Sequence, residues 1–512
     1  MKMRKGTSLL LAMVLLAGSV IGCSGGSDSS SQGNTQGGTT ASAGKGEPDL
    51  SKKLTIEVMT RSFAGGGWGD SHPVLDELNK KFNIDLKMQW VPGPNYKEKL
   101  NVLAASNDFP DLYWIDKESF DKWKERGAFL DMAPILDNYP NLTKHLSKET
   151  LEVGNPKGKL LSLPYTGVAA RDSIVVRKDW LDKLNLKVPT TIEEYMDVAR
   201  AFVNGDPDGN GKKDTIGITF GYKNGDLAME EHFRYAFGLP NQFAEKDGKL
   251  VPMQEFLPQW KAFAGFMNEA YAEGVIDKDF PISGPSDTIT KFEAGKVGIA
   301  YVNPNELENK TLPALKKLDP NAEIIQLAPP VGPNGEQGQR TFANGIEKIV
   351  INAKTDAQKQ ERVLMLLDYM LSDEGTALIG NGIEGVHYKK EGSSYTKLPA
   401  YESDRPFLLV AWLFRRDDPL NQMKLFDNQD TVNMIKGYFD MNEKYKVPNP
   451  ADGYFSETQI KKGQDLKLKW TETVTKVIMG SSPPEEFDKA YDYWKKNGGE
   501  EIVKEFNEQY QP

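Results

Sequence analysis

Three apolar stretches alternate with two amphipathic ones between residues 54 and 116, and few folds accommodate that order. The apolar stretches have the pattern of buried strands, and the amphipathic ones have helical spacing. Strands separated by helices predict right-handed crossovers and a parallel sheet, and therefore an α/β fold. The strands are expected at "LTIEVMT" from Leu54, "IDLKMQWV" from Ile84 and "DLYWID" from Asp111.

The body of the chain, from Leu54 to Pro512, is long enough for two large domains. Hydrophobic residues make up 39% of the sequence and aromatic residues 10%, which is sufficient for two cores. Its last third has mostly helical patterns, at residues 358–371 and 483–510. The net charge of -10 argues against a nucleic-acid partner, because a phosphate-binding protein carries a basic surplus.

The first 50 residues have the pattern of an export signal followed by a tether. Residues 1–22 combine three basic residues, the apolar run "LLLAMVLLAG" and small residues before Cys23. The stretch "VIGC" resembles the lipobox of bacterial lipoproteins, which implies that the thiol of Cys23, the only cysteine, carries lipid. Residues 23–50 are rich in Ser, Gly and Thr, a composition that predicts a flexible linker.

A predicted helix at residues 192–203 leads into an acidic loop, "DPDGNGKKD". The helix begins at a capping box made by Thr190 or Thr191 with Glu193 or Glu194. Oxygen-bearing side chains at alternate loop positions, with glycine at position 6, match the first nine positions of an EF-hand calcium loop. The expected ligands are the side chains of Asp206, Asp208, Asn210 and Asp214 and the backbone carbonyl of Lys212.

The loop departs from the EF-hand pattern at position 12, where Gly217 replaces the bidentate glutamate. A site that lacks this ligand would bind calcium weakly, with a dissociation constant on the order of 10⁻⁴ M. We therefore expect a structural calcium ion rather than a sensor. The alternative is a turn rich in Asp and Gly without metal, since turns favour these residues.

Several segments, in this order along the mature chain, together resemble one family. They are the lipobox, "AASNDFPDLYWID", "RKDWLDKLNLKVPTTIEEYMDVARAF", "FEAGKVGIAYV" and "GIEGVHY". The chain resembles the bacterial extracellular solute-binding proteins of family 1, in the long lipoprotein branch of YtcQ-like and LipO-like receptors of Gram-positive bacteria. The acidic loop is similar to the metal loop of the related alginate-oligosaccharide receptors, although those have an acidic residue where Thr215 stands here.

The resemblance implies a two-lobed periplasmic-binding-protein-like fold of type II, with discontinuous lobes joined by a hinge. Lobe one is expected from residues 54–163 plus a segment after 344, and lobe two from 164–343 plus part of the C-terminal helices. It also implies a monomeric, non-enzymatic receptor, lipid-anchored on the outer face of the cell membrane. Such a receptor closes on an oligosaccharide and delivers it to the permease subunits of an ABC importer.

Aromatic and polar residues near expected strand ends are the candidate sugar contacts, because sugars offer both apolar faces and hydroxyl groups. The candidates are Trp68, Asp70, Asp116, Tyr165, Arg171, Tyr301, Asn303 and Trp412. Taken singly, most of these aromatics are better explained as core residues. The exceptions are Trp68, for its glycine-rich setting, and Trp412, for its family position. An acidic uronate could pair with arginines, which are otherwise surface charge: Arg171, Arg405, Arg415 and Arg416.

Two further points concern the four histidines and the alternative classes of protein. No two of His72, His145, His232 and His387 have metal-ligand spacing in the sequence, and we interpret His387 as structural, near the hinge. A receptor for oligopeptides is one alternative. A secreted polysaccharide-degrading enzyme is another and would need a positioned acid and base. The sequence shows no nucleophile elbow, zinc-binding helix or phosphate loop to support catalysis.

Overall fold

A computed structural model describes residues 49–62, 72–165, 170–223, 226–228, 230–341, 347–408 and 414–510. The expectations for the export signal, for Cys23 and for the linker fall outside the described residues. Those for Trp68, Asp70 and Trp412 fall outside them as well, and nothing is described of the side chain of Arg405. No helix in the described part of the chain is long and apolar enough to cross a membrane.

The first sheet has five strands in the order β2-β1-β3-β14-β4. They are β1 (Leu54–Ser62), β2 (Ile84–Pro92), β3 (Leu112–Ile115), β4 (Leu163–Pro164) and β14 (Lys348–Ile351). β1 pairs in parallel with both β2 and β3, and α1 (Pro73–Phe82) and α2 (Gly93–Ser106) lie between these strands in the sequence, which confirms the predicted parallel strands connected by helices. β14 is antiparallel to β3 and β4, so a strand from far along the chain enters this sheet.

The second sheet has four strands in the order β12-β5-β11-β6. They are β5 (Ser173–Arg177), β6 (Ile216–Ile218), β11 (Val297–Val302) and β12 (Ile324–Gln326). β11 runs parallel to β6 and antiparallel to β5. All four strands lie in sequence between β4 and β14 of the first sheet, so the chain leaves the first sheet, builds the second and returns.

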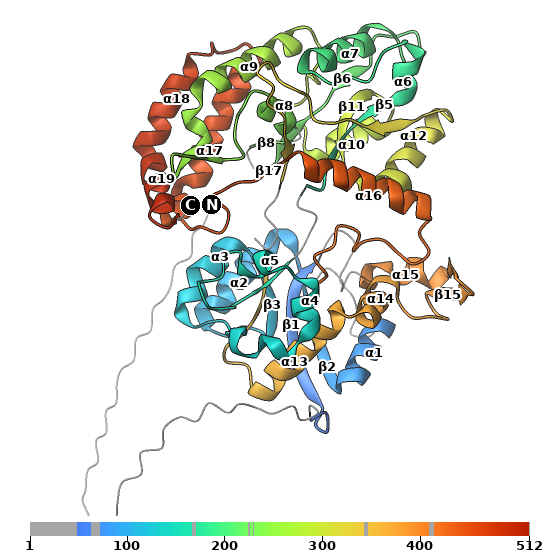
Figure 1. Ribbon diagram of the computed structural model, residues 1–512, viewed down its shortest axis with the longest axis vertical. Coiled ribbons are helices and arrows are strands. Elements are labelled where there is room, and N and C mark those ends of the chain that lie inside the picture. The colour runs from blue at the N-terminus through green and yellow to red at the C-terminus, as the bar shows by residue number, and fades with distance from the viewer. Residues whose placement is uncertain are drawn as a thin grey trace, which may run out of the picture. The chain divides into compact units, whose positions relative to one another are not determined.

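Each sheet has its own hydrophobic core. The first core includes Ile56, Leu78 and Leu112 together with Val363 and Leu367 of α13 (Ala357–Leu371). The second core includes the β-strand residues Val176 and Ile299, and it is completed by the C-terminal α17 (Glu457–Ile478) and α18 (Glu486–Trp494). Figure 1 shows α17 beside α18 and α9 (Leu257–Ala272), and α13 beside β1.

The remaining described elements are further α-helices, short 3₁₀ and π segments, and two-stranded sheets. The helices are α3 (Lys117–Trp123), α4 (Pro140–His145), α5 (Lys148–Glu152), α6 (Lys178–Lys183), α7 (Ile192–Asn204), α8 (Glu231–Ala236), α10 (Pro285–Glu293), α11 (Pro304–Glu306), α12 (Leu312–Leu318), α14 (Asp373–Asn381), α15 (Pro399–Leu408), α16 (Gln429–Lys444) and α19 (Glu500–Asn507). The two-stranded sheets pair β7 (Gly221–Lys223) with β8 (Asp226–Ala228), β9 (Phe243–Lys246) with β10 (Lys249–Pro252), β13 (Gln339–Arg340) with β17 (Lys446–Val447), and β15 (Tyr388–Glu391) with β16 (Ser394–Lys397).

Two local predictions can be compared with this structure. The capping box of α7 is the pair Thr191 and Glu194: the Glu194 amide donates to Thr191 Oγ1 at 3.3 Å, and the Thr191 amide donates to Glu194 Oε2 at 3.2 Å. The helical pattern at 483–510 is divided into α18 and α19, because Gly498 takes a φ of 139°, a conformation outside the helical range that glycine adopts readily.

Candidate functional site

Aromatic rings and guanidinium groups meet at the carboxyl ends of the first sheet's strands. Arg61 is the second-last residue of β1, Trp114 lies near the end of β3, and Tyr165 directly follows β4. The Arg61 guanidinium carbon lies 3.7 Å from the centroid of the Trp114 ring and 5.7 Å from that of Tyr165. The guanidinium carbon of Arg415 lies 5.4 Å from the centroid of the Tyr165 ring. We call these four residues the aromatic–arginine cluster.

The electrostatics of this cluster are dominated by burial and positive charge. Burial raises the pKa of Tyr165 to about 12, although the charges of Arg415 and Arg61 oppose this. Burial also lowers the pKa of Arg415, and the charge of Arg171 lowers it further. Arg61 donates to both carboxylate oxygens of Glu347, at 2.6 and 3.2 Å. The strand ends therefore bring two aromatic rings and two guanidinium groups together, and one of these guanidinium groups, that of Arg61, is paired with a carboxylate.

Of the predicted contacts, Tyr165 belongs to this cluster, and Arg171 is close enough for its charge to act on Arg415. The Arg171 side chain is 43% exposed, and its guanidinium forms two hydrogen bonds with Asp172, at 2.6 and 2.8 Å. Arg416 takes no comparable place: it donates to the carbonyl of Leu371 and pairs with Asp373 at 2.5 Å. Arg415 and Arg416 are adjacent in the sequence, but their side chains have different partners, and only Arg415 belongs to the aromatic–arginine cluster.

Three other predicted contacts are engaged by their own surroundings. Asp116 caps α3 and accepts from the amide and hydroxyl of Ser119, at 3.0 and 2.9 Å. Asn303 caps α11 by accepting from the Asn305 amide at 3.1 Å. Tyr301 is only 4% exposed, stacks on His232 at 5.7 Å and has its hydroxyl bonded by Gln339. Each of these three side chains is therefore held at a strand end by hydrogen bonds to other protein groups.

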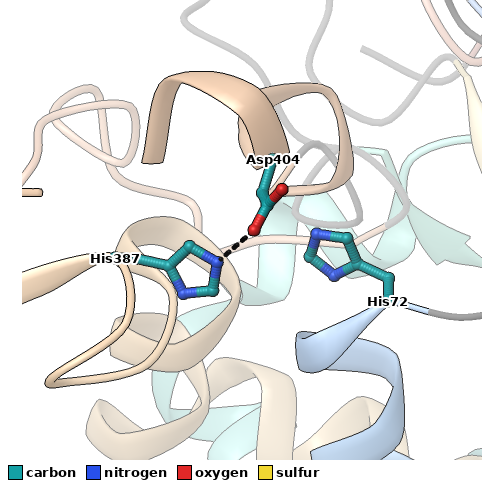
Figure 2. A group of neighbouring side chains, drawn as sticks. All are labelled: His72, His387 and Asp404. Atoms are coloured by element: carbon teal, nitrogen blue, oxygen red, sulfur yellow. Dashed lines mark hydrogen bonds and ion pairs between the residues drawn. The ribbon is translucent and has the colours of Figure 1, made fainter. Parts of the chain in front are cut away.

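The residues that sequence reasoning missed are Arg61, Trp114 and Glu347. Arg61 and Trp114 lie in segments already assigned as strands, and each is near the carboxyl end, which was the available signal. Glu347 is 286 residues away from Arg61 in the chain, and no local pattern predicts that pair. A second omission concerns histidine: the rings of His72 and His387, which are far apart in the sequence, stack at 6.2 Å (Figure 2), and sequence spacing gives no sign of this contact.

The acidic loop gathers its carboxylates around one amide. The Asn210 side-chain nitrogen donates to Asp208 at 2.7 Å and to Asp214 at 2.9 Å. Asp206 accepts from the main-chain amides of Asn210 and Gly211, both at 3.1 Å. The φ angle of Gly211 is 75°, a left-handed conformation that glycine tolerates best. The donor set is therefore three carboxylates and an amide on one turn, which is the hard-oxygen chemistry that calcium prefers.

Charge in the loop also fits a cation. Burial raises the pKa of Asp208, and the neighbouring carboxylates of Asp206 and Asp214 raise it further, because like charges repel. Asp214 pairs with Lys296 at 2.6 Å, and this interaction lowers the pKa of Asp214. A bound cation would relieve the repulsion among the carboxylates of Asp206, Asp208 and Asp214, and it would compete with Lys296 for the Asp214 carboxylate.

Position 12 of the loop has a structural reason to be glycine. Gly217 is the middle residue of β6 and is buried against α7. A Cβ atom at this position would lie 2.8 Å from the Ala199 Cβ and 2.8 Å from the carbonyl oxygens of Ala199 and Val275. The loop therefore cannot obtain its last EF-hand ligand from this position without displacing the helix from the sheet.

Comparison with known proteins gives the family. Residues 71–377 match the family described as bacterial extracellular solute-binding protein, and the chain belongs to this family. It is 30% identical to lipoprotein LipO of Bacillus subtilis strain 168, over 90% of this chain and 93% of that one. It is 29% identical to the polygalacturonan/rhamnogalacturonan-binding protein YtcQ of the same organism, over 98% of both chains.

Solved structures share the fold. An HMO-binding, ABC-transporter-associated solute-binding protein of Bifidobacterium longum infantis has a TM-score of 0.71 at 18% identity, covering 90% of this chain and 98% of that one. The alginate-binding protein AlgQ2, solved without calcium ion, has a TM-score of 0.66 at 20% identity, covering 91% and 100%. An EF-hand mutant of the binding protein FusA of S. pneumoniae has a TM-score of 0.66 at 20% identity, covering 89% and 98%. These likenesses confirm the two-lobed solute-binding fold.

Proposed function

We propose that this protein captures an oligosaccharide outside the cell and delivers it to the transmembrane subunits of an ABC importer. The observation that carries the proposal is the aromatic–arginine cluster of Arg61, Trp114, Tyr165 and Arg415 at the carboxyl ends of the first sheet. Ligands of α/β sheets bind at this edge. Aromatic faces suit the apolar faces of sugar rings, and polar groups around them suit the hydroxyls.

The charge of the site favours an acidic, uronate-containing oligosaccharide. A guanidinium group can donate two parallel hydrogen bonds to one carboxylate. A partly buried arginine therefore selects a carboxylate ligand more strongly than a surface lysine does. The charge of Arg171 lowers the pKa of Arg415, and a sugar carboxylate between the two guanidinium groups would stabilise both in their charged form. The names of YtcQ and AlgQ2, a polygalacturonan/rhamnogalacturonan-binding and an alginate-binding protein, support an acidic ligand here.

We further propose that the two sheets with their cores are two lobes that close on the ligand. Lobe one would comprise residues 54–163 and a segment after 344, and lobe two residues 164–343 with the C-terminal α16 to α19. Contacts made only in the closed form would drive closure. Trp68, Asp70 and Trp412 remain proposed ligand contacts on the strength of the sequence. Tyr301, Asp116 and Asn303 would act by holding the strand ends beneath the ligand.

A ligand screen tests this proposal against its two alternatives. The probes are oligogalacturonates, neutral oligosaccharides of equal length and a mixture of oligopeptides, and binding is measured by tryptophan fluorescence and calorimetry. We expect the oligogalacturonates to bind, more weakly at high salt because ion pairs are screened, and to be recovered intact. Binding of peptides alone would favour the peptide receptor. Shortening of the oligosaccharide would favour the enzyme.

A structural calcium ion in the loop of Asp206 to Asp214 is the second part of the proposal. The loop's donor chemistry supports it, as does the EF-hand named in the FusA structure. With a dissociation constant on the order of 10⁻⁴ M, calcium at about ten times that concentration would stabilise the native state by about 1.4 kcal/mol.

Removal of calcium by a chelator should therefore lower the melting temperature by a few degrees, as calorimetry would show. Asp208→Asn should remove this sensitivity, because it takes a charge from the loop and keeps the side chain's shape. Lys213→Gln, an exposed change in the same loop, is the matched control and should keep the response. Identical melting of the wild-type protein with calcium and with chelator would exclude the calcium site.

The anchor is the third part of the proposal. The relative named lipoprotein LipO and the extracellular family support an outer-surface location, and we propose a diacylated or triacylated Cys23, with palmitate among its acyl chains, in a Gram-positive cell membrane. Two acyl chains are needed, because a single chain binds a membrane only marginally. We expect Cys23→Ala to move the protein from the membrane fraction to the medium with unchanged melting temperature, judged by fractionation. Full membrane retention of that variant would argue against the lipid anchor.

A further inference from the structure

The Arg61 side chain reaches across one strand of the first sheet to pair with Glu347. In the strand order β1-β3-β14, Arg61 belongs to β1 and Glu347 directly precedes β14, so β3 lies between them. The Arg61 guanidinium carbon lies 3.7 Å from the centroid of the Trp114 ring on β3. Its two terminal nitrogens donate to the two carboxylate oxygens of Glu347, at 3.2 and 2.6 Å. Glu347 therefore occupies two of the guanidinium donors that a ligand carboxylate could use.

The backbone of Glu347 is held in place, whereas its carboxylate is accessible. The Glu347 carbonyl accepts the Tyr165 amide at 2.8 Å. The next residue, Lys348, belongs to β14, and its buried ammonium group donates to the carbonyl of Val153. The Glu347 side chain is 39% exposed and that of Arg61 is 21% exposed. The carboxylate can thus leave the guanidinium by rotation of the side chain, while the backbone stays where it is.

Glu347 changes the charge that an incoming anion meets. The charges of Arg415, Arg61 and Glu347 all act on the pKa of Tyr165, so the three groups lie around one ring. While Glu347 is bound to Arg61, the opposite charges of the two side chains largely cancel. An anion can then use the two donors of Arg61 only by displacing a carboxylate that already holds them.

We propose that Glu347 is a specificity-determining residue, a competing carboxylate that occupies Arg61 in the empty receptor and yields to the carboxylate of an acidic oligosaccharide. A small inorganic anion offers only its charge, and the exchange of one ion pair for another gives it little net binding energy. An oligosaccharide adds contacts of its rings and hydroxyls with the cluster. Selectivity thus comes from a competing group as well as from attractive contacts. This inference rests on the proposed function.

Glu347→Gln tests the competition, because it removes the charge and keeps the shape of the side chain. We expect its affinity for an oligogalacturonate to rise about fivefold or more in calorimetric titration, since the ligand no longer displaces a charged group. A neutral oligosaccharide of equal length should gain no affinity. Glu347→Asp keeps the charge on a shorter side chain and should give a smaller gain.

The matched control is Glu273→Gln, far from the aromatic–arginine cluster in sequence. Glu273 accepts two hydrogen bonds from Arg200 on α7, and its side chain is 43% exposed, close to the value for Glu347. This variant therefore removes one carboxylate from a similar pair. It should bind the oligogalacturonate with wild-type affinity.

A phosphate titration tests the same competition without any oligosaccharide. At constant ionic strength, about 10 mM inorganic phosphate should raise the melting temperature of Glu347→Gln by about one degree or more, because binding to the native state stabilises it. The wild-type protein and Glu273→Gln should show no such rise. The double variant Arg61→Gln/Glu347→Gln should lose the response, since the uncovered Arg61 is its cause. Differential scanning calorimetry measures all four proteins.

The outcomes separate this inference from the proposed function. A folded Glu347→Gln protein with wild-type affinity and no phosphate response would overturn the inference, and the pair would only tie β1 to β14. An equal phosphate response in the wild-type protein would overturn it as well. If Glu347→Gln did not fold, Glu347→Asp should show smaller changes in the same directions, and their absence would count against the proposal. If no oligogalacturonate bound but the phosphate responses were as expected, the proposed ligand would be wrong and the competing role of Glu347 would stand.

Discussion

Arg415→Ala should weaken binding of an acidic oligosaccharide at least about tenfold, because truncating a binding hot spot costs about 2 kcal/mol or more. Arg415 is partly buried beside Tyr165, within reach of the charge of Arg171. A ligand carboxylate there would meet two guanidinium groups, one of them partly buried. Calorimetric titration with an oligogalacturonate, near neutral pH and low salt, measures the effect.

Controls separate lost binding from lost folding. Arg415→Lys keeps the charge and removes the planar fork, so it should recover only part of the affinity. Arg171→Gln changes a more exposed residue and should weaken binding with little effect on the melting temperature. Arg200→Gln, on the exposed face of α7, should bind as the wild type does. Wild-type affinity in both Arg415→Ala and Arg171→Gln would remove the arginines from the ligand site.

Gly217→Glu should destabilise the protein by about 3 kcal/mol or more, even though it restores the glutamate of a complete EF-hand loop. The new Cβ would meet Ala199 and Val275 at 2.8 Å, and the carboxylate would enter the packing between α7 and β6. Calcium should not restore the stability of the variant, because the Cβ atom of the new residue clashes with its neighbours whether or not its carboxylate binds calcium. Thermal unfolding with and without calcium measures both statements.

The matched control places a glutamate on the exposed part of the loop. Lys213→Glu adds the same side chain at an exposed position without any buried contact, and its stability should change by less than about 0.5 kcal/mol. A Gly217→Glu protein that is as stable as the wild type and binds calcium more tightly would show that α7 and β6 can separate. The explanation of the missing twelfth ligand would then be wrong.

Features encoded by neighbouring residues could be predicted from the sequence. The alternation of β1, β2 and β3 with helices could be predicted because apolar spacing and segment length are local properties, and the capping box of Thr191 and Glu194 spans four residues. The acidic loop is likewise local, and its carboxylates do gather around Asn210. Each of these predictions needed only a few consecutive residues.

Features built by distant residues could not be predicted in this way. The bond from Arg61 to Glu347 crosses 286 residues, and its existence depends on β14 joining the first sheet. Tyr301 illustrates the opposite difficulty: its place at a strand end resembles that of a ligand contact, but packing against His232 and Gln339 engages it in the core. Burial of that kind depends on neighbours that no single segment specifies.

Small-angle X-ray scattering of the Cys23→Ala protein, with and without a saturating oligogalacturonate, tests the central claim most directly. A receptor whose two lobes close on the sugar should show a smaller radius of gyration with the acidic oligosaccharide and no change with a neutral one of equal length, because only the first adds contacts specific to the closed form. The ligand recovered afterwards should be intact. An unchanged radius of gyration at proven saturation, or a shortened oligosaccharide, would contradict the account of this protein as a closing receptor.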